Sequence, residues 1–233
     1  MELKYKRISL KLSGEAMGGK GESLDFDAVD AIAEQIASLY KMGVQVGVTL
    51  GGGNIWRGRS SGDMDRNRAD HMGMLATVIN SLAVQDALEK KGVPCVVMSS
   101  VEMPRIADGY CSRNALKALD ENKVVIFAGG TGVPFFSTDT AAALKAAETH
   151  AEVLMLAKNV DAVYSADPKL VKDAKRYTHL SYDDVIEQNL NATDITAITL
   201  CREQKIPILV FAMKEEENIL KAVCGEEVGT LIN

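Results

Sequence analysis

The chain has 233 residues, of which 47% are hydrophobic and 25% charged, and its formal net charge is −6. This length and composition are typical of a globular protein that buries a sizeable core. The acidic balance disfavours a nucleic-acid partner, because such proteins usually carry an excess of basic residues. The sequence has no apolar run of membrane-spanning length and no signal-peptide core at its N-terminus, so we expect a cytoplasmic protein without a membrane partner.

The cysteines and histidines form no pattern of a metal site or a disulfide framework. Cys95, Cys111, Cys201 and Cys224 lie far apart, without a C-x-x-C pair. This spacing predicts reduced thiols rather than zinc ligands or disulfides. The three histidines are isolated from one another, which disfavours a histidine-based metal site.

Apolar runs that are typical of buried strands alternate with helical patterns over almost the whole chain. Strands are predicted at 7–12, 44–50, 93–98, 123–127, 152–156 and 208–211, and helices at 26–42, 65–91, 111–119, 137–150, 193–205 and 215–224. This alternation predicts an α/β fold, a three-layer α/β/α sandwich with a largely parallel central sheet. No linker or repeat interrupts the pattern, so we expect one domain over residues 1–233.

The helix predicted at 65–91 has more apolar residues than one buried face needs. They are Met72, Met74, Leu75, Val78, Ile79, Leu82 and Val84. This excess predicts burial on two sides, as in a subunit interface.

Three glycine-rich loops follow predicted strands, within 13–21, 51–54 and 128–132. In an open parallel sheet, the loops at the carboxyl ends of the strands form the ligand crevice. Glycines there allow backbone N–H groups to approach and cradle a phosphate. One such loop could be a simple turn, but three of them favour an anion or phosphate site.

Neither of the two common nucleotide motifs is present. Residues 14–21 almost match the P-loop, but Gly21 replaces the hydroxyl residue that would reach magnesium, and the segment continues through polar and glycine residues instead of opening a helix. No G-x-G-x-x-G occurs, so the dinucleotide fingerprint of an oxidoreductase is also absent.

Charged residues beside the glycine loops are candidates for phosphate chemistry. Lys11 lies in a buried strand, where a charge is costly unless it faces the crevice or a partner, and it would neutralise the transferring phosphoryl group. Arg57 offers a planar fork that suits phosphate oxygens, whereas Arg59 is more simply explained as a solvated loop residue. Asp70 would either accept ribose hydroxyls or favour the start of its helix.

The remaining polar candidates also have structural explanations. Asp139 would cap a helix or add a charge beside the third glycine loop. Tyr164 would stack on an adenine, or belong to an ordinary Asp-Pro turn with Asp167. Asp194 is most simply a helix cap.

Five segments together carry a family resemblance. They are KLSGEAM (11–17), GGGNIWRG (51–58), ADHMGMLATVINSLAVQDAL (69–88), GGTGVPFFSTDTAA (129–142) and NVDAVYSADP (159–168). In this order they resemble the bacterial uridylate (UMP) kinases of the amino-acid-kinase superfamily, over essentially the whole chain. The first two segments also occur in looser form in carbamate, acetylglutamate and aspartate kinases, whereas the third and fourth look specific to the UMP kinases.

The resemblance implies transfer of a phosphoryl group from ATP to UMP, with magnesium, in pyrimidine nucleotide biosynthesis. It implies a UMP side at roughly 1–150 and an ATP side at roughly 151–233. On the ATP side it implies roles for Lys11, Leu12, Ser13, Gly14, Gly53, Arg57, Asn159, Tyr164 and Asp167, with Lys11 and Arg57 as the catalytic residues. Either Lys158 or Asn159 would make the adenine-side contact.

For UMP the resemblance implies contacts by Gly52, Asp70, Thr131, Gly132, Val133, Pro134, Phe135, Phe136, Ser137 and Thr138. It also implies a homohexamer with the long helix in the dimer contact, activation by GTP and inhibition by UTP. The regulatory segment would include Gly19, Lys20, Gly21, Glu22, Ser23 and Leu24. Magnesium would be held mainly by the nucleotide phosphates.

The residue types agree with this chemistry. A UMP phosphate oxygen is already anionic near neutral pH, so no general base is needed, and alignment with charge neutralisation is sufficient. The alternatives are a sister kinase with another small acceptor and a non-catalytic uridine-nucleotide sensor. The segment 131–142 argues against the first alternative, and the retained Lys11 and Arg57 argue against the second.

Overall fold

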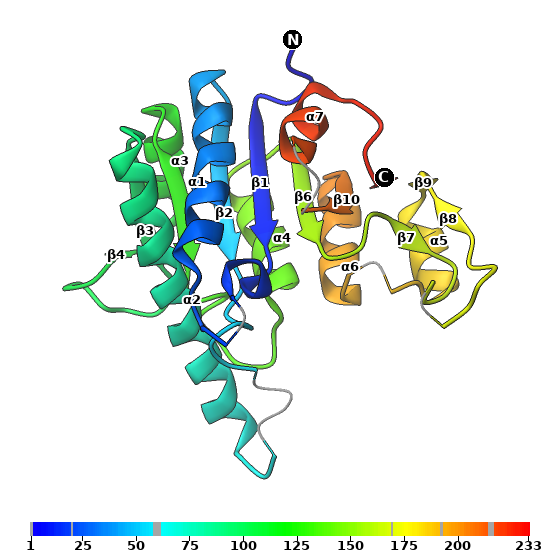
Figure 1. Ribbon diagram of the computed structural model, residues 1–233, viewed down its shortest axis with the longest axis horizontal. Coiled ribbons are helices and arrows are strands. Elements are labelled where there is room, and N and C mark those ends of the chain that lie inside the picture. The colour runs from blue at the N-terminus through cyan, green and yellow to red at the C-terminus, as the bar shows by residue number, and fades with distance from the viewer. Residues whose placement is uncertain (1, 20, 58–61, 169, 192, 214–216) are drawn as a thin grey trace.

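A computed structural model describes residues 2–19, 21–57, 62–168, 170–191, 193–213 and 217–233. In these ranges nine strands form one sheet with helices on both faces (Figure 1). The strands are β1 (Arg7–Leu12), β2 (Gln45–Leu50), β3 (Cys95–Ser99), β4 (Asp108–Gly109), β5 (Val124–Ala128), β6 (Val153–Lys158), β9 (His179–Leu180), β10 (Ile208–Ala212) and β11 (Thr230–Ile232). A separate antiparallel pair joins β7 (Val163–Tyr164) to β8 (Arg176–Tyr177).

The sheet has the strand order β4-β3-β5-β2-β1-β6-β10-β11-β9. Neighbouring strands are parallel, except that β11 runs antiparallel to β10. Parallel neighbours need crossover connections, which explains why helices separate the long strands in the sequence. The central strands β1, β2, β5 and β6 are buried on both faces, as their continuous apolar runs predict.

The helices divide between the two faces of the sheet. They are η1 (Gly14–Met17, a 3-10 turn), α1 (Phe26–Lys41), α2 (Arg66–Lys90), α3 (Ser112–Asp120), α4 (Thr138–Glu148), α5 (Tyr182–Glu187), α6 (Ile195–Gln204) and α7 (Asn218–Cys224). α1, α2 and α7 cover one face, and α3, α4 and α6 cover the other. The predicted three-layer α/β/α sandwich is therefore confirmed.

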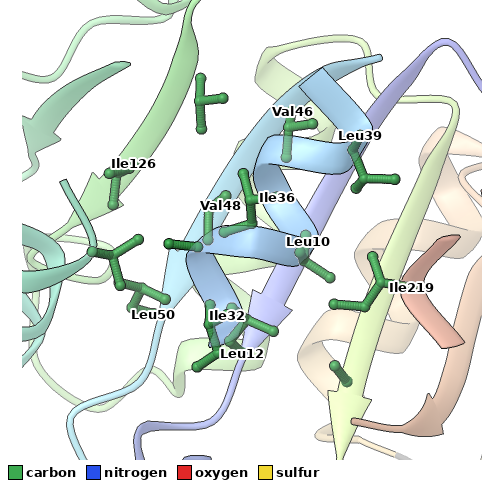
Figure 2. Close-up of a cluster of buried hydrophobic side chains, with 14 of the residues drawn as sticks. Leu10, Leu12, Ile32, Ile36, Leu39, Val46, Val48, Leu50, Ile126 and Ile219 are labelled. Atoms are coloured by element: carbon green, nitrogen blue, oxygen red, sulfur yellow. The ribbon is translucent and has the colours of Figure 1, made fainter. Parts of the chain in front are cut away.

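The core beneath α1 is built from aliphatic side chains that interdigitate between helix and sheet (Figure 2). Alternate residues of β1, including Leu10 and Leu12, point toward Ile32 and Ile36 of α1. Because side chains alternate along a strand, Lys11 lies on the opposite face, toward α4. The burial of Leu10 and Leu12 under α1 thus determines that the Lys11 side chain points to the other face of the sheet.

The long elements agree with the sequence predictions to within about three residues, whereas several short elements were not predicted. These are β4, β9, β11 and α5, together with the β7–β8 pair. The expectation that the segment after β1 opens no helix was wrong in one respect, since the 3-10 turn η1 begins at Gly14. The P-loop remains excluded, because η1 has four residues and is followed by extended backbone at Gly18.

In the described ranges, no helix is both long enough and apolar enough to cross a membrane. In the part of the chain that the structure describes, Cys95, Cys111, Cys201 and Cys224 form no disulfide.

Candidate functional site

A cavity of about 590 Å³ lies at the carboxyl ends of the central strands. The three glycine loops meet there, since Gly14, Gly52 and Gly130 all line it. Their convergence was predicted from the rule that parallel strands present their ligand loops at one edge of the sheet. The volume falls in the range of small-molecule sites, about 300–1,000 Å³.

A buried charged cluster forms one wall of this cavity. Lys11 is 7% exposed, and its Nζ lies 2.8 Å from Asp139 Oδ1 in the first turn of α4. Lys158, at the end of β6, contacts the other carboxylate oxygen of Asp139 at 3.0 Å. Thr193 Oγ1 donates a hydrogen bond to that same oxygen at 2.7 Å. One carboxylate therefore orients two ammonium groups at the edge of the cavity.

The cationic neighbours control the ionisation of Asp139. Burial by itself would raise the pKa of this carboxyl, but the charges of Lys11 and Lys158 outweigh the burial. The pKa of Asp139 is consequently held well below its ordinary value, and hydrogen bonds from Lys11 and Thr193 act in the same direction. Asp139 is thus an anion at neutral pH, and with two cations beside it the cluster has a positive excess for binding phosphate.

The second glycine loop presents unused backbone donors to the cavity. Within the described ranges, the backbone N–H groups of Gly52 and Gly53 have no hydrogen-bond acceptor. Both glycines line the cavity. A Cβ at Gly52 would lie 2.8 Å from Cβ of Ala76 and from the carbonyl oxygen of Gly73, so no larger residue fits against α2. Two free N–H groups beside a pair of ammonium groups form a site suited to phosphate oxygens.

Glu15 joins two segments at the mouth of the cavity. Its carboxylate pairs with Arg57 and also accepts a hydrogen bond from Asn159 Nδ2 at 3.0 Å. Glu15, Arg57 and the second glycine loop all line the cavity. An anionic ligand would therefore compete with Glu15 for the Arg57 guanidinium.

On the opposite wall, Asp70 holds the third glycine loop. Its Oδ2 accepts the backbone N–H of Phe135 at 2.8 Å and pairs with Arg66 Nε at 2.9 Å. Phe135 has a φ of 73°, a left-handed conformation that is uncommon for a bulky residue. The Asp70 side chain thus fixes a strained backbone position in the segment that was predicted to surround UMP.

A further carboxylate joins the N-termini of two helices. Asp194 is the N-cap of α6, and its carboxylate also accepts hydrogen bonds from the hydroxyls of Ser137 and Thr140. Ser137 is itself the N-cap of α4. Both helices therefore begin at the cavity with their N-terminal ends in a fixed relation.

The structure brings most of the predicted site residues together. Those that line the cavity are Lys11, Ser13, Gly14, Gly52, Gly53, Arg57, Asp70, Thr131, Val133, Phe135, Phe136, Ser137 and Thr138. Gly132 and Pro134 belong to the same loop but do not line the cavity. The side chain of Leu12 is buried in the core instead (Figure 2).

Three residues predicted for the adenine side, Asn159, Tyr164 and Asp167, lie outside this cavity. Tyr164 donates a hydrogen bond to Asp161 in the β7 region, and Asp167 does not line the cavity. Asn159 contacts Glu15, while Lys158 lines the cavity, so the two alternatives for the adenine contact occupy different surroundings. The predicted regulatory residues Gly19, Gly21, Glu22, Ser23 and Leu24 also do not line it, and Lys20 and Arg59 lie outside the described residues.

Several cavity residues were missed or assigned only a structural role by sequence reasoning. Glu15, Arg66 and Thr193 received no functional assignment, and Asp194 was interpreted as a cap alone. Lys158 could have been found from its pattern, because it ends an apolar strand, and Lys11 is the next-to-last residue of another such strand. No comparable signal identifies Arg66 or Thr193.

Comparisons with known proteins agree with this geometry. A model of the amino acid kinase family matches residues 6–212. The chain is similar in structure to a UMP kinase from Bacillus anthracis, with 38% identity and a TM-score of 0.95, over 98% of this chain and 96% of that one. It is also similar to a UMP kinase from Ureaplasma parvum, with 37% identity and a TM-score of 0.93, over 99% and 100% of the two chains. A uridylate kinase from Archaeoglobus fulgidus has 29% identity and a TM-score of 0.74, over 98% and 100%.

Proposed function

Because this chain belongs to the amino acid kinase family, and within it to the UMP kinases, which are nucleoside monophosphate kinases, we propose that it transfers the γ-phosphoryl group of ATP to UMP. The products are ADP and UDP. The observation that carries this proposal is the Lys11–Asp139–Lys158 cluster beside the free N–H groups of the second glycine loop. This arrangement supplies positive charge and oriented donors on one side of a cavity of nucleotide size.

The reaction requires alignment rather than proton abstraction. An anionic oxygen of the UMP phosphate forms a bond to the γ-phosphorus of ATP, while the bond from that phosphorus to the β–γ bridging oxygen breaks. The electron pair remains on ADP, so charge builds up on the transferred oxygens and the leaving group. Lys11 and Lys158 would stabilise this charge, and Arg57 and the glycine N–H groups would align the phosphates.

We expect magnesium to enter with ATP. Among the described residues, no three His, Cys, Asp or Glu side chains converge on one point. Magnesium is commonly held by substrate phosphates with only one or two carboxylates, and Glu15, Asp139 and Asp194 offer such oxygens in the cavity. When bound, the ion would neutralise charge on the phosphates.

We also propose that the cavity has a UMP side and an ATP side, and the lining residues support this division. Residues up to about 150 contribute Asp70 and the 131–138 loop, which we assign to UMP. Residues 151–233 contribute Lys158, Thr193 and Asp194 to the cavity, and we assign the ATP side to this part. Tyr164 and Asp167 would then hold the ATP base and ribose beyond the described cavity.

We also propose a homohexamer in the cytoplasm that is activated by GTP and inhibited by UTP and that supplies UDP for pyrimidine nucleotide biosynthesis. An exposed apolar stripe on α2 supports self-association. It comprises Met72, Leu75, Ile79 and Leu82, which are 36–52% exposed and lie on one helical face. The segment 19–24 remains the proposed regulatory segment, and the family resemblance is its support.

The deciding experiment is an ADP-release assay with ATP, magnesium and separate acceptors. UMP, CMP, dUMP, AMP and carbamate would be tested, each with and without GTP and UTP. We expect turnover with UMP to exceed turnover with every other acceptor. Preferred turnover with another acceptor would assign the chain to a sister kinase. Binding of UMP by folded protein without any turnover would favour the uridine-nucleotide sensor.

A further inference from the structure

Two side-chain amides form a reciprocal pair behind the second glycine loop. Asn80 of α2 is fully buried, and its Nδ2 donates to Asn54 Oδ1 at 2.8 Å and to the carbonyl oxygen of Gly51 at 2.7 Å. Asn54 Nδ2 donates in return to Asn80 Oδ1 at 3.0 Å and to the carbonyl oxygen of Ser23 at 2.6 Å. The pair therefore joins α2, the glycine loop and the segment before α1.

The surroundings of this pair leave little freedom for the loop. A Cβ at Gly14 would lie 2.5 Å from Asn54 Oδ1 and 2.6 Å from the backbone nitrogen of Gly53. On the other side, Gly52 packs directly against Ala76 and Gly73 of α2. The loop is thus held between the first glycine loop and α2, and the amide pair supplies its directional bonds.

The hydrogen-bond partners of a buried amide indicate what the amide does for the fold. Burying an amide costs free energy unless its donors and acceptors are satisfied, and an apolar residue of similar size would avoid that cost. Each Nδ2 group of this pair donates two hydrogen bonds, one to the other amide and one to a backbone carbonyl. A satisfied network of this kind favours one backbone conformation over alternatives.

We propose that Asn54 and Asn80 are positioning residues, which hold the N–H groups of Gly52 and Gly53 in place for a nucleotide phosphate and connect them to Ser23. The inference rests on the proposed function, because it requires a phosphate-bearing substrate in the cavity. Neither amide side chain lines the cavity, so the pair acts through the loop backbone. Ser23 lies in the proposed regulatory segment. A conformational change of that segment would therefore be transmitted through Asn54 to the N–H groups of Gly52 and Gly53.

The test compares UMP with uridine, which lacks the phosphate. Equilibrium binding of both ligands would be measured by calorimetry for the wild-type chain, Asn54→Ala, Asn80→Ala and the double variant. We expect each variant to weaken UMP binding about tenfold, the effect of losing one hydrogen bond to a charged group, while uridine binding changes less than twofold. Because the two amides act as a pair, the double variant should lose no more affinity for UMP than either single variant does.

Controls separate positioning from a general loss of structure. Asn114→Ala changes an exposed amide on α3 and should leave both affinities unchanged. Thermal unfolding would verify that each variant is folded, and Asn54→Ala alone decides the outcome if Asn80→Ala does not fold. Equal weakening of UMP and uridine, unchanged UMP binding, or multiplicative effects in the double variant would each overturn the inference. Wild-type protein that binds UMP no more tightly than uridine would contradict the proposed function as well.

Discussion

Lys11 is nearly buried and faces the cavity, so its loss should affect turnover more than folding. In Lys11→Ala, Asp139 retains its pairing with Lys158 and its bond from Thr193. We expect the turnover number to fall about 10²–10³-fold, as for loss of one transition-state contact. Steady-state assays with UMP and ATP would measure this effect, with Lys41→Ala on α1 as the surface control. Near-normal turnover in Lys11→Ala would remove Lys11 from the chemistry.

Asp139 makes stability depend on pH in a defined direction. The cations Lys11 and Lys158 overcome the effect of burial and lower its folded pKa, so its contribution to stability is complete above the ordinary aspartate pKa of about 4 and is lost as the pH falls below it. Asp139→Asn should lower the free energy of unfolding by about 3 kcal/mol at pH 7, because the buried Lys11 and the partly buried Lys158 lose their anion.

Urea unfolding of wild type and Asp139→Asn between pH 3 and 7 would measure this dependence. The difference between the two proteins should shrink as the pH falls toward 3. The control is Asp120→Asn, whose exposed carboxylate pairs with Arg7 and should contribute less than about 1 kcal/mol. A difference between wild type and Asp139→Asn that is constant with pH would contradict the assigned ionisation.

The sequence alone did not decide whether Asp70 binds the ribose or stabilises the start of its helix. Its bond to the Phe135 N–H adds a third role, since it fixes a left-handed residue in the acceptor loop. Asp70→Ala should raise the apparent KM for UMP about tenfold, more than that for ATP, because a bond to a charged group is lost. Asp70→Asn keeps an acceptor for the Phe135 N–H and should therefore raise the apparent KM for UMP less than Asp70→Ala does. Equal effects of Asp70→Ala on both substrates would indicate a purely structural role.

The long elements could be predicted from the sequence, because their signals are strong. β1, β2 and β5 are continuous apolar runs, and α1 has a single apolar stripe. The two-residue strands and the six-residue α5 were missed, because such lengths contain no full period of either pattern. Their positions depend on tertiary pairing, as when β9 joins the sheet through β11.

Helix α2 carries a prediction about assembly. Among the apolar residues of α2, the structure buries Met74, Val78 and Val84 in the core. Leu75 and Ile79 remain 52% and 47% exposed. If this stripe is a subunit contact, Leu75→Glu should weaken association by about 2 kcal/mol or more, because it places a charge in an apolar contact. Sedimentation over a range of concentrations would show dissociation into smaller species.

The control for α2 is another exposed apolar residue on a helix. Phe26, at the start of α1, is 71% exposed, and Phe26→Glu places an acid where a helix tolerates it well. Phe26→Glu should leave the assembly intact. An unchanged sedimentation profile of Leu75→Glu would exclude this face of α2 from the assembly.

At the scale of the whole molecule, the sequence predicted the meeting of the glycine loops but not the partners that join them. Parallel strands place their loops at one edge, so the cavity follows from strand order. The hydrogen bonds that the hydroxyls of Ser137 and Thr140 donate to Asp194 join residues more than 50 positions apart in the chain, and no local pattern encodes them. The same limit applies to the strained Phe135, because only the folded chain brings Asp70 to its N–H.

The two halves of the cavity should therefore be stabilised together by substrate, and Cys201 can report this effect. Cys201 of α6 is fully buried, and burial, with the Asp194 charge, raises its thiol pKa to about 12, whereas Cys111 is exposed. A thiol reagent at pH 8 should modify Cys111 rapidly and Cys201 only through opening of the structure.

UMP at 100 times its Kd stabilises the folded state by about 2.7 kcal/mol, so it should slow Cys201 modification about 100-fold. Modification of Cys111 should proceed at the same rate with and without UMP. If UMP leaves the Cys201 rate unchanged, binding at the Asp70 side does not stabilise α6, and the two sides of the cavity are energetically independent.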